Sequence, residues 1–327
     1  MIAKPGMPLA EPKPFFWIPV NYSKRKNAPV SHGSFIGLNG YLDLEVKVQS
    51  DFLYVGSGSI LLNEPKQSYY AFAKSKGRLI IPATSMKGPV RSVAEAISGS
   101  CVSQIYWKER NPGLKAPCKI KKDQEASAAL CPTCGLFGTT GYMGRAHFVD
   151  AVPVGNLKSE IIKISDLWPP RVALARKFYQ AKSFVPQENS RPERNHRFLE
   201  VVPKDSIFAT KLFFENTSPG EMSLLIRSLG IGFPEGVTDN PNPKYLVPIK
   251  IGGAKPRCLG AVRFAINGIR QLQGTKGDFL GTTIDGVKAY STMKEWLKDE
   301  SLIDEVAWLR FVEGAKPMSE PCPKELY

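Results

Sequence analysis

The chain contains the stretch Gly40-Tyr41-Leu42-Asp43-Leu44-Glu45-Val46-Lys47-Val48-Gln49, in which apolar and polar side chains alternate strictly. Alternation with a period of two predicts a strand with one buried face, because successive side chains of a strand point to opposite sides. We expect this strand to end in the glycine-rich turn 55–59. Interspersed strands and few helices predict an α+β fold with large insertions. The other strand patterns lie at 78–82, 145–152, 208–215 and 260–266, and the helix patterns at 85–98 and 220–229.

The helix predicted over 85–98 carries two cations near its start. Ser85 suits the N-cap, and Lys87 and Arg91 lie four residues apart on one face. Cations at a helix N-terminus oppose the helix dipole unless an anion binds there. A phosphate held by the first amides, Ser85, Lys87 and Arg91 removes this conflict. The alternative is two solvated surface cations.

The two ends of the chain differ in character from its middle. Residues 1–35 contain six prolines and predict an extended arm without a core of its own, either disordered or lying on a neighbouring subunit. Residues 36–270 form the main domain. Residues 271–327 predict a helical extension with capping boxes at Thr292-x-x-Glu295 and Ser301-x-x-Asp304.

The composition is that of an ordinary globular protein with an excess of positive charge. Among 327 residues, 44 Lys and Arg stand against 30 Asp and Glu, which gives a net charge of +14. Such an excess favours a polyanionic partner, although scattered surface charge is the plainer explanation. No stretch approaches the length of a membrane span, and no signal-peptide pattern opens the chain. We therefore expect a cytoplasmic protein without a membrane partner.

Four of the six cysteines lie in the irregular stretch 100–140. A Cys-x-x-Cys turn supplies two zinc ligands, and the two nearest cysteines complete a tetrahedral set. The alternative is reduced, buried cysteines. Such a zinc site is structural, because four thiolates leave no open position for water. His147 is a possible substitute ligand. In a reducing cytosol we expect no disulfides, and we expect Cys258 and Cys322 to be ordinary residues. The predicted ligands are Cys101, Cys118, Cys131 and Cys134.

The stretch 171–197 combines seven cations with only two carboxylates and has aromatic residues between them. Guanidinium groups and aromatic rings favour phosphate and base contacts, whereas a plain charged surface is the alternative. The glycine-rich loop 250–260 resembles a phosphate cradle, with Lys255 and Arg257 as its cations. The seven cations of the first stretch are Arg171, Arg176, Lys177, Lys182, Arg191, Arg194 and Arg197.

Five motifs in the same order resemble those of the RAMP superfamily of CRISPR effector proteins. Each is weak alone, but five in sequence identify the chain as similar to this family over about 40–266. The motifs are 55–58, 81–91, 131–138 with 144–150, 171–174 with 200–203, and 252–257 with 259–260.

The resemblance implies a ferredoxin-like (RRM-type) core with a zinc-knuckle insertion at 100–140 and a thumb hairpin at 171–198. It is closest to a type III backbone subunit, in which Ser85, Lys87 and Arg91 contact the guide RNA. The thumb of such a subunit inserts into the guide–target duplex. The implied partners are CRISPR guide RNA, complementary target RNA, other RAMP subunits and the large signalling subunit.

The chain departs from the cleaving members of this family at the loop after the first strand. Those members carry an aspartate there that promotes metal-dependent cutting, and residues 56–67 contain none. We therefore interpret the protein as a binder. One alternative is an endoribonuclease that uses Asp51 or Glu64 with Mg²⁺, or that processes the guide with His196. Another is a capping subunit that contacts mainly protein.

Overall fold

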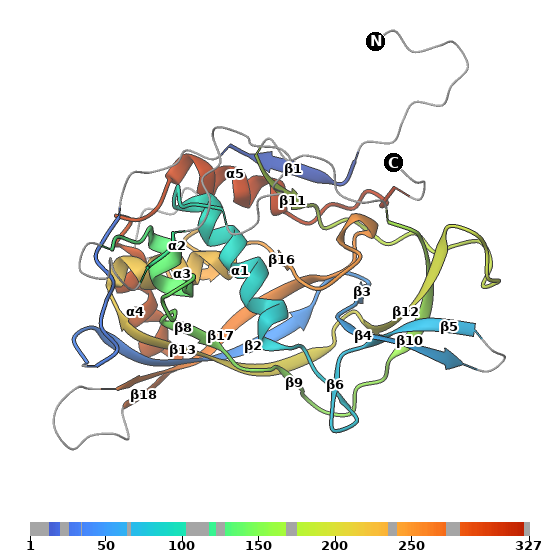
Figure 1. The fold of residues 1–327 in the computed structure, drawn as a ribbon, viewed down its shortest axis with the longest axis horizontal. Helices are drawn as coiled ribbons and strands as arrows, with labels where there is room; N and C mark the ends of the chain where they lie inside the picture. The colour runs from blue at the N-terminus through green and yellow to red at the C-terminus, as the bar shows by residue number, and fades with distance from the viewer. Residues whose placement is uncertain are drawn as a thin grey trace, which may run out of the picture.

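The computed structural model describes residues 13–19, 26–33, 35–63, 67–102, 118–121, 128–167, 175–234, 241–272 and 282–323. A central antiparallel sheet dominates the fold (Figure 1). Its strands lie in the order β16 (Ile249–Lys250), β17 (Ala261–Leu272), β2 (Leu38–Val48), β13 (Ile207–Thr217) and β8 (Ala146–Phe148). β9 (Val152–Pro153) also pairs with β13, and β18 (Thr282–Asp285) pairs with β17.

The order of elements along the chain is β2, α1 (Ala83–Ile97), β8, β13, α3 (Pro219–Ser228) and β17, with further elements inserted. Both helices contribute to one core with the sheet. The strand predicted around residues 40–49 is confirmed. Leu42, Leu44, Val46 and Val48 are at most 2% exposed, because alternation sends them all to the helix side.

Helix α1 has the predicted buried stripe but a different start. Val90, Val93 and Ile97 are buried. The helix begins at Ala83 after Pro82, so the prediction of Ser85 as N-cap is wrong. The carboxylate of Asp150 accepts a hydrogen bond of 2.8 Å from the Ala83 amide. A side chain distant in sequence therefore caps the helix. The residues around the helix start do not reveal this cap, because Asp150 lies 67 positions further along the chain.

Helix α3 agrees with its predicted range to within a residue. Ser218 accepts from the amide of Glu221, and the Glu221 carboxylate accepts from the Ser218 amide. This capping box, with Pro219 in the first helical position, defines the helix start from local sequence alone.

A second sheet projects from the central one, at the right of Figure 1. Its order is β10 (Glu160–Ser165), β12 (His196–Pro203), β5 (Gln67–Phe72) and β4 (Gly56–Asn63), and β3 (Phe52–Leu53) also pairs with β12. The glycine turn predicted at 55–59 is therefore wrong. Residues 56–59 instead begin β4, whose register against β5 shifts between Gly56 and Ile60, and Gly58 takes a φ of +83° inside that irregularity.

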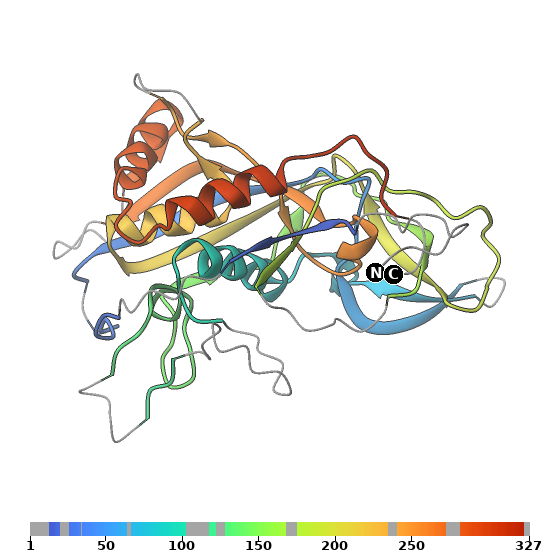
Figure 2. The same cartoon turned by 90° about the horizontal axis from the view of Figure 1, so that it is seen from above.

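The predicted N-terminal arm and thumb hairpin are both altered by one pairing. β1 (Phe15–Ile18) pairs with β11 (Arg176–Tyr179) of the same chain. Phe16 stacks on Phe178 and contacts Phe311 of α5 (Glu305–Ala315), and Figure 2 shows β1 beside that helix. Part of the arm thus belongs to this chain's own core. Because β11 pairs with β1 while β12 pairs with β10, the segment 175–198 is not a hairpin among the described strands.

The C-terminal helices start elsewhere than predicted. Thr292 lies inside α4 (Gly286–Leu297), where its hydroxyl donates to the Lys288 carbonyl. Helix α5 is capped by Asp304, which accepts from the amide of Ala307. Asp304, rather than Ser301, caps this helix because its side chain reaches the third amide of the helix directly. The remaining short elements are β6 (Lys74–Ser75), β7 (Arg78–Leu79), α2 (Pro132–Phe137), β14 (Ile231–Gly232), β15 (Lys244–Tyr245) and the 3₁₀ turn η2 (Lys255–Arg257).

Two cysteines expected to be ordinary thiols are bonded to each other. Cys258 and Cys322 form a disulfide across a separation of 64 residues. The expectation of no disulfides is therefore wrong, since the fold brings the C-terminal tail onto the glycine-rich loop. None of the helices described by the structure is both long and apolar enough to cross a membrane.

Candidate nucleic-acid interface and metal centre

The four predicted zinc ligands converge on one buried point. The ligand atoms of Cys101, Cys118, Cys131 and Cys134 all lie within 4.8 Å of one another. Cys101 Sγ lies 3.2 Å from Cys131 Sγ and 3.3 Å from Cys134 Sγ. Tetrahedral zinc with bonds of about 2.3 Å holds its sulfurs about 3.8 Å apart, so this spacing fits. The cluster can hold a metal ion such as zinc.

The thiols of the cluster influence one another's protonation. Hydrogen bonding from Cys101 lowers the pKa of the Cys118 thiol to about 6 and also lowers the pKa of Cys131. The thiolate is the form of cysteine that binds a metal, so a lowered pKa favours metal binding. Within the described residues, His147 is not part of this group and lies on β8, so the cluster is complete without it.

Arg91 connects the cysteine cluster to helix α1. Its Nη1 donates to the carbonyl of Gly138 at 2.8 Å, and its Nη2 lies 3.6 Å from Cys134 Sγ. Its Nε donates at 2.9 Å to Glu95, a carboxylate that is fully buried and also pairs with Arg176. Two cations predicted to contact RNA thus share one internal carboxylate.

The start of α1 is less open to a phosphate than the sequence predicts. Asp150 already occupies the first amide, as described above. Ser85 and Lys87 are half-buried, and burial, followed by the nearby Arg91, lowers the pKa of Lys87. Their contact with RNA stays a prediction.

Several cations of the basic stretch have partners within the chain. The ammonium group of Lys182 lies 2.6 Å from a carboxylate oxygen of Glu320, and Arg197 pairs with Asp166 and lies over the ring of Tyr70. Arg191 and Arg194 are exposed. Arg171 lies outside the described residues. Only some of the cations that the composition of this stretch provides are therefore exposed on the surface, Arg191 and Arg194 among them.

Three sequence-predicted pieces meet at one groove of about 270 Å³. Helix α1 contributes Gly88 and Ser92, β11 contributes Lys177, and the glycine-rich loop region contributes Lys250 and Lys255. Lys250 and Ser92 were not predicted as site residues from the sequence, although Lys250 opens the glycine-rich loop. The groove therefore assembles cations from segments far apart in the chain.

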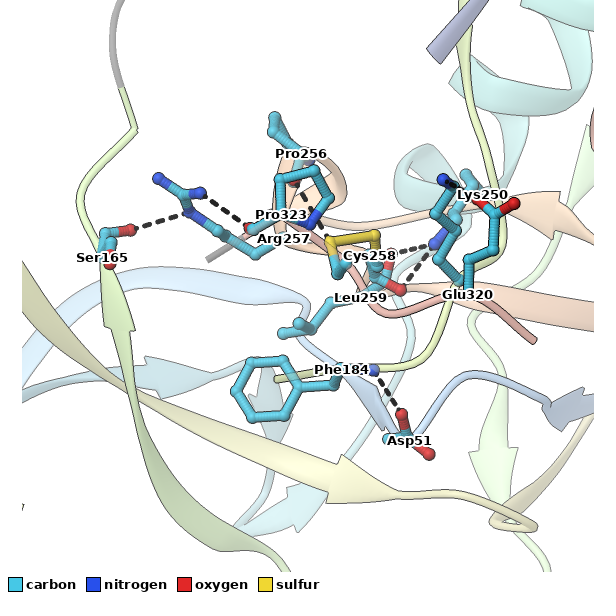
Figure 3. The surroundings of a disulfide bond; sticks show 12 residues. Asp51, Ser165, Phe184, Lys250, Pro256, Arg257, Cys258, Leu259, Glu320 and Pro323 are labelled. Carbon is cyan, nitrogen blue, oxygen red and sulfur yellow. Dashed lines mark hydrogen bonds and ion pairs between the residues drawn. A yellow bond between two sulfur atoms is a disulfide. The ribbon is translucent and has the colours of Figure 1, made fainter. Parts of the chain in front are cut away.

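The groove lysines are partly shielded from water. Lys177 Nζ lies 4.0 Å from the ring centroid of Phe15 and 5.0 Å from that of Tyr179. Burial lowers the pKa of Lys250 to about 7 and that of Lys255 to about 8. Lys250 Nζ donates to the carbonyls of Cys258 and Leu259, at 2.6 and 3.1 Å (Figure 3). A phosphate entering here would meet Lys177 and Lys255 in a weakly screened environment, whereas the amino group of Lys250 is already held by two carbonyls.

A protein-family model described as the RAMP superfamily matches residues 45–257. The chain belongs to the RAMP superfamily. A search of curated proteins found no match. RAMP membership fits a CRISPR-associated role in RNA binding, since RAMP proteins generally bind RNA and other subunits of their complexes.

In this RAMP protein, Asp51 supports a loop. Its Oδ2 accepts from the amide of Phe184 at 2.6 Å (Figure 3). The other catalytic candidate, Glu64, lies outside the described residues. His196 contacts the carbonyl of Arg194 and the side chain of Gln187, at 3.1 and 3.3 Å. These contacts hold the imidazole ring against the surface of the second sheet.

Arg257, predicted to cradle a phosphate, instead holds the RAMP chain together. It is 5% exposed and donates to the carbonyls of Ser165, Asp166 and Pro323. Figure 3 shows it next to the disulfide. The glycine-rich loop therefore presents Lys255, rather than Arg257, to the groove.

Proposed function

We propose that this RAMP protein binds the guide RNA of a type III CRISPR interference complex as a backbone subunit. The groove between α1, β11 and the glycine-rich loop carries the proposal, because it places Lys177, Lys250 and Lys255 on one concave surface. Phosphates are recognised by such clustered cations, and each contact releases counterions. The proposed partners are guide RNA, target RNA, other RAMP subunits and the large signalling subunit, in the cytoplasm.

The proposed core is ferredoxin-like. Its support is the chain order β2, α1, β8, β13, α3, β17 together with the sheet order β17, β2, β13, β8, which places the first strand between the fourth and the third. The proposed ion of the cysteine cluster is zinc. It is supported by the buried Cys₄ donor set, which is typical of structural zinc sites.

The proposed duplex-inserting part is the loop that carries Arg191 and Arg194. Both side chains are exposed, and the loop leads into β12 of the projecting sheet. Its neighbours fix its base, because Lys163 pairs with Glu193 and Nζ also donates to Asn189. A loop held at its base and basic at its tip suits insertion between two strands of RNA.

We propose binding without cutting. The support is that Asp51, the candidate nearest the first strand, has one carboxylate oxygen accepting from the Phe184 amide. Incubation of the assembled complex with labelled target RNA and Mg²⁺ tests this. Cuts that disappear in Asp51→Asn would instead establish a metal-dependent endoribonuclease.

The groove is tested with Lys177→Gln and Lys255→Gln, singly and together. Guide-RNA affinity is measured by fluorescence anisotropy between 50 and 400 mM salt. Each lost contact to single-stranded RNA is expected to reduce the slope of log K against log salt by about 0.7. Lys298→Gln is the matched control, since Lys298 is exposed at the C-terminal end of α4 and is not among the residues that line the groove. Unchanged affinity in the double variant, or binding that is insensitive to salt, would overturn the proposal.

A further inference from the structure

The C-terminal tail, residues 316–323, runs alongside residues 181–183 of the basic stretch. The Met318 amide donates to the Ala181 carbonyl at 2.8 Å, and the Ser183 amide donates to the Glu320 carbonyl at 3.2 Å. The Cys322 amide donates to the Ser183 carbonyl at 2.8 Å. These three bonds align the tail with 181–183, in the manner of an added strand.

The disulfide fixes the far end of this tail. Cys322 is bonded to Cys258 at the end of the η2 turn, and both residues are buried. Cys258 has a φ of +64°, a conformation in which glycine is favoured over residues with a Cβ. A cysteine at a left-handed position carries a conformational cost, which indicates that its sulfur, here bonded in the disulfide, has a functional or structural role.

The tail covers two cations predicted to contact RNA. Glu320 places a carboxylate oxygen 2.6 Å from Lys182 Nζ, and the Lys182 side chain is only 5% exposed. The carbonyl of Pro323 accepts from Arg257 at 3.3 Å. The Glu320 carboxylate thus occupies the place beside Lys182 that a phosphate oxygen would take. Figure 3 shows Glu320 and Pro323 on either side of the disulfide.

We propose that Cys258 and Cys322 form a thiol–disulfide modification site that controls access to Lys182. In the oxidised form the tail is held at one end by α5 and at the other by the disulfide, which keeps Glu320 next to Lys182. In the reduced form only the tail's non-covalent contacts remain. The tail then exchanges with RNA phosphates, a consequence that rests on the proposed function.

The chemistry is thiol–disulfide exchange. A dithiol reductant attacks one sulfur, the S–S bond breaks, and both cysteines end as thiols while the reductant becomes a disulfide. The reverse step transfers two electrons and two protons from the cysteines to a small-molecule disulfide, which becomes two thiols. Both sulfurs are buried, so exchange follows a transient opening of the tail. The cysteines of the metal cluster are separate from this pair.

The test compares the full-length protein, purified without reductant, with Cys322→Ser under the same conditions. This avoids exposing the metal cluster to a reductant. Thiols are counted after denaturation with a chelator, and tail release is followed by limited proteolysis. We expect four free thiols in the wild type and a faster tail cleavage in the variant. Six free thiols in the wild type, or equal cleavage rates, would overturn the site.

RNA affinity is measured on the same samples, with Glu320→Gln as a variant that keeps the disulfide and weakens the hold on Lys182. One additional phosphate contact at 0.15 M salt corresponds to about a fourfold higher affinity and a slope steeper by about 0.7. If RNA binding depends on the groove lysines but the wild type, Cys322→Ser and Glu320→Gln bind RNA with equal affinity, the tail does not control access to Lys182. If the tail is released but neither form binds RNA, the modification site stands and the proposed function fails.

Discussion

Glu95 is the residue whose replacement is expected to be the most damaging to the fold. Its side chain is fully buried in α1, and each of its oxygens has a guanidinium partner. Arg91 Nε donates to Oε1 at 2.9 Å, and Arg176 of β11 pairs with Oε2. The two arginine side chains are themselves only 15% and 11% exposed. Two poorly solvated cations therefore share one carboxylate.

Glu95→Gln keeps the volume of the side chain and removes its charge. The two guanidinium groups then face each other with no anion between them. Removing one partner of a buried ion pair costs about 3–5 kcal/mol, because the remaining charge stays desolvated. We expect the free energy of unfolding to fall by about that amount. The double variant E95Q/R176M is expected to lose less than the sum of the single losses, since one stranded cation is gone.

The assay is urea denaturation followed by tryptophan fluorescence at pH 7. Glu313→Gln is the matched control, because Glu313 pairs with Lys316 but is 74% exposed. An exposed pair of this kind contributes under about 1 kcal/mol. A loss for Glu95→Gln no larger than that of the control would refute the reasoning. A large loss would also mean that RNA effects of Arg91 and Arg176 substitutions have to be corrected for stability.

Three further predictions concern the metal, the pH dependence and the loop anchor. Metal analysis is expected to find one zinc per chain, and Cys134→Ser is expected to lose the zinc and lower the melting temperature; a wild-type protein without zinc would contradict this. Lys250 has a folded pKa lowered to about 7, so the unfolded chain binds more protons than the folded one above that pH. The free energy of unfolding that this group contributes therefore rises as pH increases from about 7 towards its ordinary pKa of about 10.4. Urea denaturation at several pH values should show that the free energy of unfolding of Lys250→Met depends less on pH than that of the wild type. Asp51→Asn weakens the bond to the Phe184 amide and is expected to cost about 1 kcal/mol in thermal unfolding, while target RNA with Mg²⁺ stays uncut as in the wild type.

The elements that follow from local sequence could be predicted. The alternation in β2 and the Ser218–Glu221 box of α3 act through neighbours in the chain, so the residues themselves carry the information. The clustering of the four cysteines could also be predicted, since they lie within 34 residues of one another. Family motifs in a fixed order added the RAMP assignment, which the family model supports over 45–257.

The candidate site could be predicted only in part. Helix α1, the basic stretch and the glycine-rich loop do meet at one groove. The individual cations could not be sorted, because their partners are distant in sequence: Glu95 for Arg176, Glu320 for Lys182, and Pro323 for Arg257. Composition counts charges, whereas burial and pairing decide which charges remain for a ligand.

The sequence by itself determined the α+β character, the cysteine cluster and the family of this protein, because short-range periodicity, spacing and motif order are sufficient for these. Only the tertiary structure decided the pairing of β1 with β11, the cap that Asp150 places on α1, and the Cys258–Cys322 disulfide. Each of these joins residues more than 60 positions apart. Such contacts form because the common core brings the segments together, and no local preference specifies them.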